Sequence, residues 1–359
     1  MIDLRKANRS DRVYGVLVHP HNIDDEYDEI DLGEGAVLNY NYYSDERVTG
    51  SFCPINFPDI NNRLLRIYYE TEIDGERERM ELETLFMRRR SIAYAAGAKD
   101  RDVELHSRIY RWVTDYLAKD VMWHPTTPAI NHLNFYFNDL DEAMMYYDPA
   151  VNIQKKPASS VCTSKVGEKF LKTINFVADY IGAGALDVDT HGKLVMKPYL
   201  APADRPVVWT FVDDENCMYA DELTIDSLED DIPSGINVYS SKNGGMARRM
   251  ELPSSSPYSY YQRGRRVHAY YRHDELETSD QVAAKCKEYY DRMLSLVVSV
   301  EISHYFAPIR HGDAVRFVRA ETGTDVVGIV HAMDRELKPG IPTRTVLDIV
   351  NGALGNVYP

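Results

Sequence analysis

The residues best suited to metal chemistry are the histidine pair His19-Pro20-His21 and the acidic run Asp24-Asp25-Glu26 that follows it. Histidine nitrogens and carboxylate oxygens are common zinc ligands, but a zinc site needs such groups to converge on one point. Closeness in sequence does not provide that convergence, and a solvated surface segment explains the acidic run equally well. We therefore predict no metal site here.

The segment Asp187-Val188-Asp189-Thr190-His191-Gly192 resembles the first half of a calcium-binding loop. Such a loop ends with a bidentate carboxylate at its twelfth position, where this sequence has Pro198. His191 also replaces an oxygen ligand. Because Asp and Gly serve tight turns equally well, we predict a β-turn between two strands.

No complete catalytic or cofactor-binding motif is present. The glycine pairs Gly33-x-Gly35 and Gly182-x-Gly184 lack the third glycine of a dinucleotide-binding fingerprint, and Gly182 is better explained as the end of a helix. No G-x-S-x-G motif occurs. We expect no enzymatic activity, no cofactor and no metal. The cysteines are far apart in the sequence and should be buried free thiols: Cys53, Cys162, Cys217 and Cys286.

Two basic clusters stand out, Arg88-Arg89-Arg90 and the tyrosine-flanked Arg263-Gly264-Arg265-Arg266. Such clusters bind single-stranded nucleic acid or sugars, or pair with acidic residues of another subunit. The chain has 56 acidic and 41 basic residues, a net charge of −15, which argues against stable nucleic-acid binding. We therefore predict subunit contacts at these residues: Arg88, Arg89, Tyr260, Tyr261, Arg265, Arg266, Tyr270 and Tyr271.

Alternation of apolar and polar residues predicts strands along most of the chain. The predicted strands cover 13–18, 65–73, 80–87, 207–212, 223–228, 236–240, 297–302, 315–318 and 326–332. Asp74-Gly75 is a typical turn of a two-residue hairpin. The acidic segment 24–35 and the Ser-, Gly- and Pro-rich segment 240–263 are predicted to be loops.

Apolar residues recur at helical spacing over 103–116, 166–181 and 279–297. The second helix has Ser164 as its expected N-cap and Gly182 as its end. Its buried stripe is expected to contain Val166, Phe170, Ile174 and Val177.

Composition is that of a folded protein, with 44% apolar residues and 26 tyrosines. Tyrosine suits half-buried strands and interfaces, because its ring packs while its hydroxyl keeps a hydrogen-bond partner. No apolar run has signal-peptide or membrane-spanning length, so we expect no membrane anchor. The order of predicted elements indicates a β-rich α+β protein.

Four stretches in succession resemble the central hub proteins of bacteriophage tail tips and baseplates. The first is Arg63-Leu64-Leu65-Arg66-Ile67-Tyr68-Tyr69-Glu70 with its returning strand, within 50–92. The second is the helix 169–181 followed by Asp187-Val188-Asp189-x-x-Gly192-Lys193-Leu194. The third is Pro233-Ser234-Gly235-Ile236-Asn237-Val238-Tyr239, and the fourth is the helix 279–294 followed by His311-Gly312-Asp313-Ala314-Val315.

This resemblance implies a homotrimer in which each chain supplies two tube-like β-barrel domains and an intervening α+β region. Three chains would form a pseudo-sixfold ring around the DNA channel, without catalytic residues. The implied divisions are a first tube-like domain over 1–100, an α+β domain over 101–200, a second tube-like domain over 201–340 and a C-terminal tail over 341–359. The implied partners are a tail tube or distal tail protein, a tape measure protein and receptor-binding or fibre proteins. The implied location is the tail tip of a virion assembled in the host cytoplasm.

Carbohydrate binding or hydrolysis by a β protein is the alternative function, suggested by the tyrosines and abundant carboxylates. An enzyme of that kind needs two carboxylates about 5–10 Å apart, in a cleft beside aromatic rings. A hub should instead bury its aromatic residues between subunits.

Overall fold

The fold is described from a computed structural model, which places residue 4 and residues 9–54, 63–89, 93–95, 98–100, 103–137, 145–214, 218–227, 233–256, 258–294, 296–321 and 323–350. Strands hold 46% of the chain and helices 17%. This confirms the predicted β-rich α+β class.

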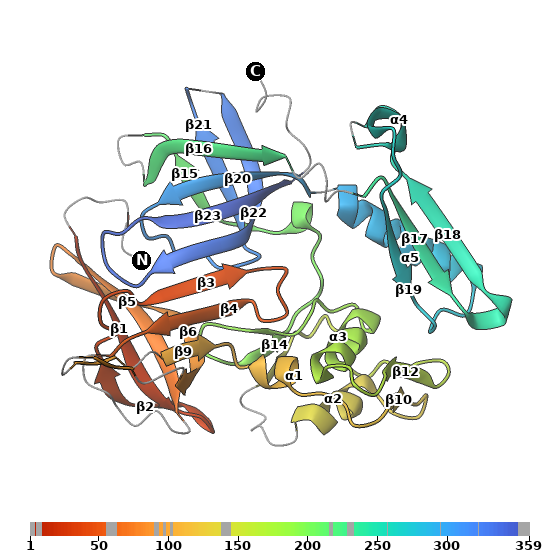
Figure 1. The fold of residues 1–359 in the computed structure, drawn as a ribbon, viewed down its shortest axis with the longest axis horizontal. Helices are drawn as coiled ribbons and strands as arrows, with labels where there is room; N and C mark the ends of the chain where they lie inside the picture. The colour runs from red at the N-terminus through yellow and green to blue at the C-terminus, as the bar shows by residue number, and fades with distance from the viewer. Residues whose placement is uncertain are drawn as a thin grey trace.

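Thirteen of the described strands form one large sheet (Figure 1). Its N-terminal strands are β1 (Ser10–His19), β2 (Asn22–Ile30), β3 (Val37–Asn41), β4 (Val48–Phe52), β5 (Leu64–Ile73), β6 (Glu76–Arg89) and β9 (Val103–His106). Its C-terminal strands are β15 (Val207–Val212), β16 (Tyr219–Ser227), β20 (Leu296–His304), β21 (Ala314–Arg319), β22 (Thr324–Glu336) and β23 (Thr343–Val350).

The hydrogen-bonded order of this sheet is β16-β20-β23-β22-β3-β4-β9-β6-β5-β1-β2, with β21 also pairing β22 and β15 pairing β21. The pairing of β22 with β3 joins the two ends of the chain, with Ala332 opposite Asn41. One apolar core spans both halves, and the rings of Tyr69 and Phe306 stack within it at 3.5 Å. The described strands do not close into a barrel.

A central α+β unit lies over 109–198, between the two halves in sequence. Its helices are α1 (Tyr110–Thr114), α2 (Ala129–Phe137) and α3 (Phe170–Tyr180), and its short strands are β10 (Val121–Trp123), β11 (Met145–Tyr147), β12 (Val161–Ser164), β13 (Asp187–Val188) and β14 (Leu194–Met196). Trp123, Leu133, Ile174 and Val177 form the centre of a separate core and are fully buried. A two-stranded ribbon, β7 (Ala93–Ala95) and β8 (Ala98–Asp100), precedes this unit, and a short turn of helix, η2 (Pro202–Asp204), follows it.

A small unit on the right of Figure 1 consists of a three-stranded sheet and one long helix. Its elements are β17 (Gly235–Ser240), η3 (Lys242–Gly244), β18 (Met246–Glu251), α4 (Tyr260–Arg263), β19 (His268–Arg272) and α5 (Ser279–Leu294). The strand order is β18-β17-β19. Ile236 and Val238 of β17 pack against Val282 and Cys286 of α5, so the helix covers one face of the sheet.

Most predicted strands, and the helices α3 and α5, are confirmed. The Asp74-Gly75 turn is also confirmed, because both residues adopt positive φ (53° and 84°) between β5 and β6, as a type I′ hairpin turn requires. No helix among the described residues is long and apolar enough to cross a membrane.

Two predicted loops were wrong. The acidic segment 24–35 contains most of β2, which pairs with β1 through its backbone while only Ile23 and Ile30 are buried along it. The segment 240–263 contains β18 and α4, because its residues pair with β17 and pack at the end of α5.

Two helix predictions also need correction. The segment 103–116 divides into β9 and the short α1, because β9 pairs with both β4 and β6. The helix predicted from 166 begins at Phe170 with Lys169 as N-cap, not Ser164. Gly167 adopts φ +80°, which interrupts a helix, and Val166 is 61% exposed.

Candidate functional site

The turn between β13 and β14 fixes the central unit on the large sheet. Arg66, with a side chain only 1% exposed, donates to the His191 carbonyl oxygen at 2.9 Å, and Arg108 donates to the Gly192 carbonyl oxygen at 2.7 Å. Gly192 adopts φ +94°, and a Cβ there would lie 3.0 Å from Thr84. The predicted β-turn is therefore confirmed, and its backbone carbonyls are bound by the sheet.

The histidines considered for metal binding do not meet the acidic run. The rings of His19 and His21 lie 5.9 Å apart, while Asp24 accepts a hydrogen bond from His191 Nε2 at 2.7 Å. His191 Nδ1 also contacts Glu81 at 3.1 Å, so this imidazole bridges the turn and the sheet. Within the described residues, no three His, Cys, Asp or Glu side chains are grouped to hold a metal ion.

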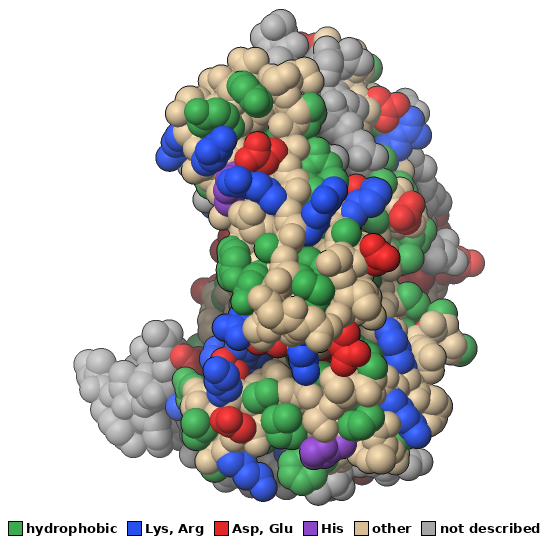
Figure 2. Space-filling model, turned by 90° about the vertical axis from the view of Figure 1, so that its right-hand side faces the viewer, with side chains coloured by type: hydrophobic (Ala, Val, Ile, Leu, Met, Phe, Trp, Pro, Cys, Tyr) green, Lys and Arg blue, Asp and Glu red, His purple; other side chains and the backbone are tan. Residues whose placement is uncertain are grey.

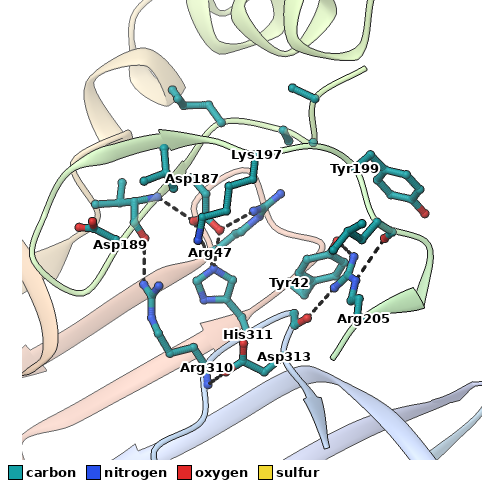
Figure 3. A pocket seen from close by; sticks show the side chains of 18 of the residues that line it. Tyr42, Arg47, Asp187, Asp189, Lys197, Tyr199, Arg205, Arg310, His311 and Asp313 are labelled. Carbon is teal, nitrogen blue, oxygen red and sulfur yellow. Dashed lines mark hydrogen bonds and ion pairs between the residues drawn. The ribbon is translucent and has the colours of Figure 1, made fainter. Parts of the chain in front are cut away.

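A cavity of about 690 Å³ opens where the central unit meets the large sheet. It is lined by segments 42–47, 183–189, 197–200, 205–208 and 310–314, together with Asn175 and Asp179 of α3. Figure 3 shows charged and aromatic side chains from three parts of the chain converging on it.

Asp187 links the three parts, which are the β3–β4 turn, the central unit and the loop before β21. One of its carboxylate oxygens is 2.8 Å from Arg47 NH1 and 3.1 Å from His311 Nε2 (Figure 3). Burial alone would raise the pKa of Asp187, but His311 and Arg47 outweigh it and hold that pKa well below its ordinary value. Through these ion pairs Asp187 ties β13 to the β3–β4 turn and to the loop before β21.

Beneath Asp187 lies a buried ion pair between Arg310 and Glu83 of β6. The guanidinium makes two parallel hydrogen bonds to the carboxylate, at 2.7 and 2.8 Å, and a third to the Val188 carbonyl oxygen at 3.0 Å. Burial disfavours charge on Arg310, but the carboxylates of Glu83 and Asp187 more than compensate and raise its pKa. A fork of this kind fixes both position and orientation, so Arg310 joins both halves of the sheet to the central unit.

Arg205 lines one side of the cavity and connects two segments there. Its guanidinium donates to the Gly312 carbonyl oxygen and to the Tyr42 hydroxyl, each at 2.5 Å (Figure 3). Gly312 adopts φ +78°, and a Cβ at this position would lie 2.7 Å from the Tyr42 ring. Only glycine allows both the turn and this approach.

The carboxylates that line the cavity all bind a cation or a backbone N–H. Asp45 contacts Lys169, Asp179 contacts Lys285, Asp187 contacts Arg47, Asp189 accepts the Lys193 N–H and Asp313 accepts the Arg310 N–H. Glycoside hydrolysis needs one carboxyl that donates a proton and a second that acts as base or nucleophile. Burial raises the pKa of Asp313, but its carboxylate is held within its own turn. The pairs of Asp45, Asp179 and Asp187 connect separate units of the fold, and we call this network, with the Arg310–Glu83 pair, the structural joint.

A second candidate surface is the face of the small sheet opposite α5. Tyr239, Arg249, His268, Tyr270 and Arg272 occupy it, because they alternate with the residues that contact the helix. Tyr270 is 62% exposed. Arg249 NH2 lies 2.8 Å from His268 Nδ1. We call these five residues, with the adjoining Arg266, the basic face.

The predicted contact residues fall on two separate parts of the fold. Arg88, the last residue but one of β6, is exposed and donates to the Tyr110 hydroxyl at 2.7 Å. The side chain of Arg89 lies outside the described residues. Arg266 packs over the Tyr260 ring beside the small sheet, close to Tyr261, Arg265 and Tyr270 in sequence. Tyr271 stacks on Tyr289 of α5 and so lies on the opposite face from Tyr270.

The described cysteines Cys53, Cys162 and Cys286 are free thiols, as predicted, but only Cys286 is buried, while Cys162 is exposed. Cys217 lies outside the described residues. The residues of the joint were missed, because Arg47, Asp187 and Arg310 come from segments more than one hundred residues apart. The His311-Gly312-Asp313 turn was the nearest sequence indication of this site.

No protein-family model matches this chain, and no curated protein sequence matches it. Solved structures do match it. A tail protein from Neisseria meningitidis is 13% identical, with 95% of this chain and 97% of that chain covered and a TM-score of 0.66. The 43 kDa tail protein of prophage MuSo2 from Shewanella oneidensis is 11% identical, with 94% and 98% covered and a TM-score of 0.59.

A chain of a PdpA–VgrG complex is also similar, at 10% identity and a TM-score of 0.52, with 100% of this chain and 68% of that chain covered. At these identities the comparisons establish the fold. The chain has the fold of phage tail proteins and of a chain of this PdpA–VgrG complex, which confirms the resemblance found in the sequence.

Proposed function

We propose that this chain is a structural hub of a phage-type tail tip or baseplate and is not an enzyme. The observation that carries the proposal is the match to a tail protein over 95% of this chain and 97% of that one. The cavity supports it, because three of its carboxylates, Asp45, Asp179 and Asp187, form ion pairs between separate units of the fold. The role is geometric: the hub joins the tail tube to the receptor-binding parts and surrounds the DNA channel.

Three copies would form the ring. The N-terminal strands and the C-terminal strands make two similar-sized halves of one sheet, joined by β3 and β22. In this ring, each half of the sheet would form one tube-like segment next to a neighbouring chain. Three chains would then contribute six segments to the wall of the tube. The proposed divisions remain 1–100, 101–200, 201–340 and 341–359. The large sheet draws mainly on the first and third, with β9 from the second and β23 from the fourth.

The proposed partners are a second and third copy, the tail tube or distal tail protein, the tape measure protein and receptor-binding or fibre proteins. The net charge of −15 would leave surplus carboxylates facing solvent and the channel, where they repel DNA phosphates. We accordingly propose no stable nucleic-acid binding and a location in the virion tail tip.

Size exclusion coupled to light scattering tests the proposed assembly. The protein is measured alone and with its tail-tube protein, which would supply a template for the ring. We expect a species of three chains, about three times the 41.2 kDa monomer mass. A monomer under both conditions would contradict the proposed ring.

A further inference from the structure

The basic face carries more positive than negative charge, although Glu251 and Asp274 pair with its arginines. Its three arginines, Arg249, Arg266 and Arg272, have two acidic partners, Glu251 and Asp274. Arg272 Nε lies 2.8 Å from Asp274, and the Arg272 side chain remains 59% exposed. Arg249 Nε and Arg266 Nε lie 3.2 and 3.8 Å from the same Glu251 oxygen. Both guanidinium side chains remain about half exposed, at 46% and 54%.

Exposed tyrosines border these arginines. Tyr270 stacks at 6.5 Å on Tyr239 within the face, and Tyr261, 70% exposed, packs beside Tyr260 at the end of the sheet. Figure 2 shows basic side chains standing among apolar ones over the upper part of this side of the molecule. Tyrosine and arginine together are typical of protein contact surfaces, because they supply large contact area with few rotatable bonds and with directed hydrogen bonds.

The complementary surface is the edge strand β2. Residues 22–31 contain six acidic residues and no basic residue. Asp25 and Asp28 are exposed, and they form no hydrogen bond or ion pair with the described part of the chain. Among the described strands β2 pairs with β1 alone, so its outer edge is open.

The two surfaces lie at opposite ends of the long axis of the molecule, β2 on the left of Figure 1 and the small sheet on the right. Two different complementary surfaces on one chain produce a head-to-tail contact, and repetition of that contact closes a ring when the rotation allows. Opposite charge also guides such surfaces into register.

We propose that the basic face of one copy docks on the acidic edge strand β2 of a second copy. Arg266 and Arg272 face the carboxylates of Asp25 and Asp28, and Tyr270 packs between them. This inference rests on the proposed function, because it names the contact by which copies assemble.

A charge-exchange experiment tests the contact. The face variant is Arg266→Glu with Arg272→Glu, the edge variant is Asp25→Lys with Asp28→Lys, and the third protein carries all four changes. The matched control is Lys172→Glu with Lys287→Glu, which makes the same change of charge at two exposed lysines on α3 and α5. A milder pair, Arg266→Gln with Arg272→Gln, replaces the face variant if circular dichroism shows that the latter does not fold.

Sedimentation equilibrium gives the dissociation constant of each protein, with tail-tube protein added if the wild type needs it. We expect each single-surface variant to associate at least about tenfold more weakly, the four-change protein to recover most of the affinity, and the control to match the wild type. The inference is overturned if neither variant weakens association, if only one does, or if the combination does not recover.

Failure of the inference is distinguishable from failure of the proposed function. A wild type that forms trimers while both variants also form them leaves the hub intact and places the contact elsewhere. A wild type that stays monomeric in every condition would contradict both the proposed ring and the proposed contact. Fluorescence anisotropy with a labelled single-stranded oligonucleotide provides the last arm: binding by the wild type that the face variant loses would identify a nucleic-acid surface and overturn the protein contact.

Discussion

Replacement of Arg310 by methionine isolates the buried ion pair beneath the cavity. Methionine has similar length and retains the packing, but it leaves the Glu83 carboxylate without its bidentate partner in a site where its side chain is 2% exposed. Removal of one partner of a buried pair typically reduces the free energy of unfolding by about 3–5 kcal/mol.

The cost of protonating Glu83 gives a similar value for the loss of unfolding free energy. An unpaired buried carboxylate takes up a proton rather than stay charged, and for an ordinary glutamate this costs about 4 kcal/mol at pH 7 but only about 1 kcal/mol at pH 5. Burial already raises the pKa of Glu83 even with Arg310 present. The folded variant therefore binds more protons than its unfolded state, so its stability rises relative to the wild type as the pH falls from 7 to 5.

Urea unfolding followed by circular dichroism at pH 7 and pH 5 measures this effect. Addition of Glu83→Gln to the Arg310→Met variant should abolish this pH dependence relative to the wild type, because no ionisable group then remains at that position. The matched control is Arg316→Met, which breaks an equally bidentate but exposed pair with Asp325 and should change stability little. Equal losses for Arg310→Met and Arg316→Met, or a loss independent of pH, would refute the reasoning.

Three further predictions concern other parts of the fold. Burial lowers the pKa of His304 to about 4. The free energy of unfolding should therefore fall by up to about 3 kcal/mol as the pH decreases from 6.5 to 4, because the unfolded chain binds a proton at this histidine before the folded chain does. His304→Gln should flatten the curve of stability against pH over that window. Gly192→Ala should lower the melting temperature more than Gly167→Ala, because both have positive φ but only Gly192 contacts the sheet. Ile174→Ala, at a fully buried position, should reduce the unfolding free energy by about 2–5 kcal/mol, and Phe170→Ala, at a partly buried one, by less in the same urea titration.

Sequence patterns among neighbouring residues predicted the strands, turns and helices that form without distant contacts. The strand β5 alternates, its hairpin turn carries Asp74 and Gly75, and α3 keeps an apolar stripe ending at Gly182. These features depend on neighbours in sequence, and the sequence was sufficient to predict them.

The strand β2 shows why other elements were missed. Its exposed acidic residues have no alternating pattern, and only its backbone pairing with β1 makes it a strand. The helix predicted over 103–116 failed for a related reason, since pairing with two other strands overrides the helical preference of β9. Tertiary pairing of this kind is not encoded in the spacing of nearby residues.

The ion pairs of the structural joint at the cavity could not be predicted from neighbouring residues either. Asp187 could be predicted as a turn residue, but its partners Arg47 and His311 lie in distant segments. The pairing of β22 with β3 that brings these segments together joins residues about 290 positions apart. The basic face was partly predictable, because Arg265, Arg266 and Tyr270 cluster in sequence.

Cryo-electron microscopy of the protein assembled on its tail tube tests the central claim most directly. The account predicts three copies around one axis at the end of the tube, with the strands of each chain contributing two segments to a continuous wall. Copies arranged without threefold symmetry, or density for this chain that lies away from the end of the tube, would contradict it.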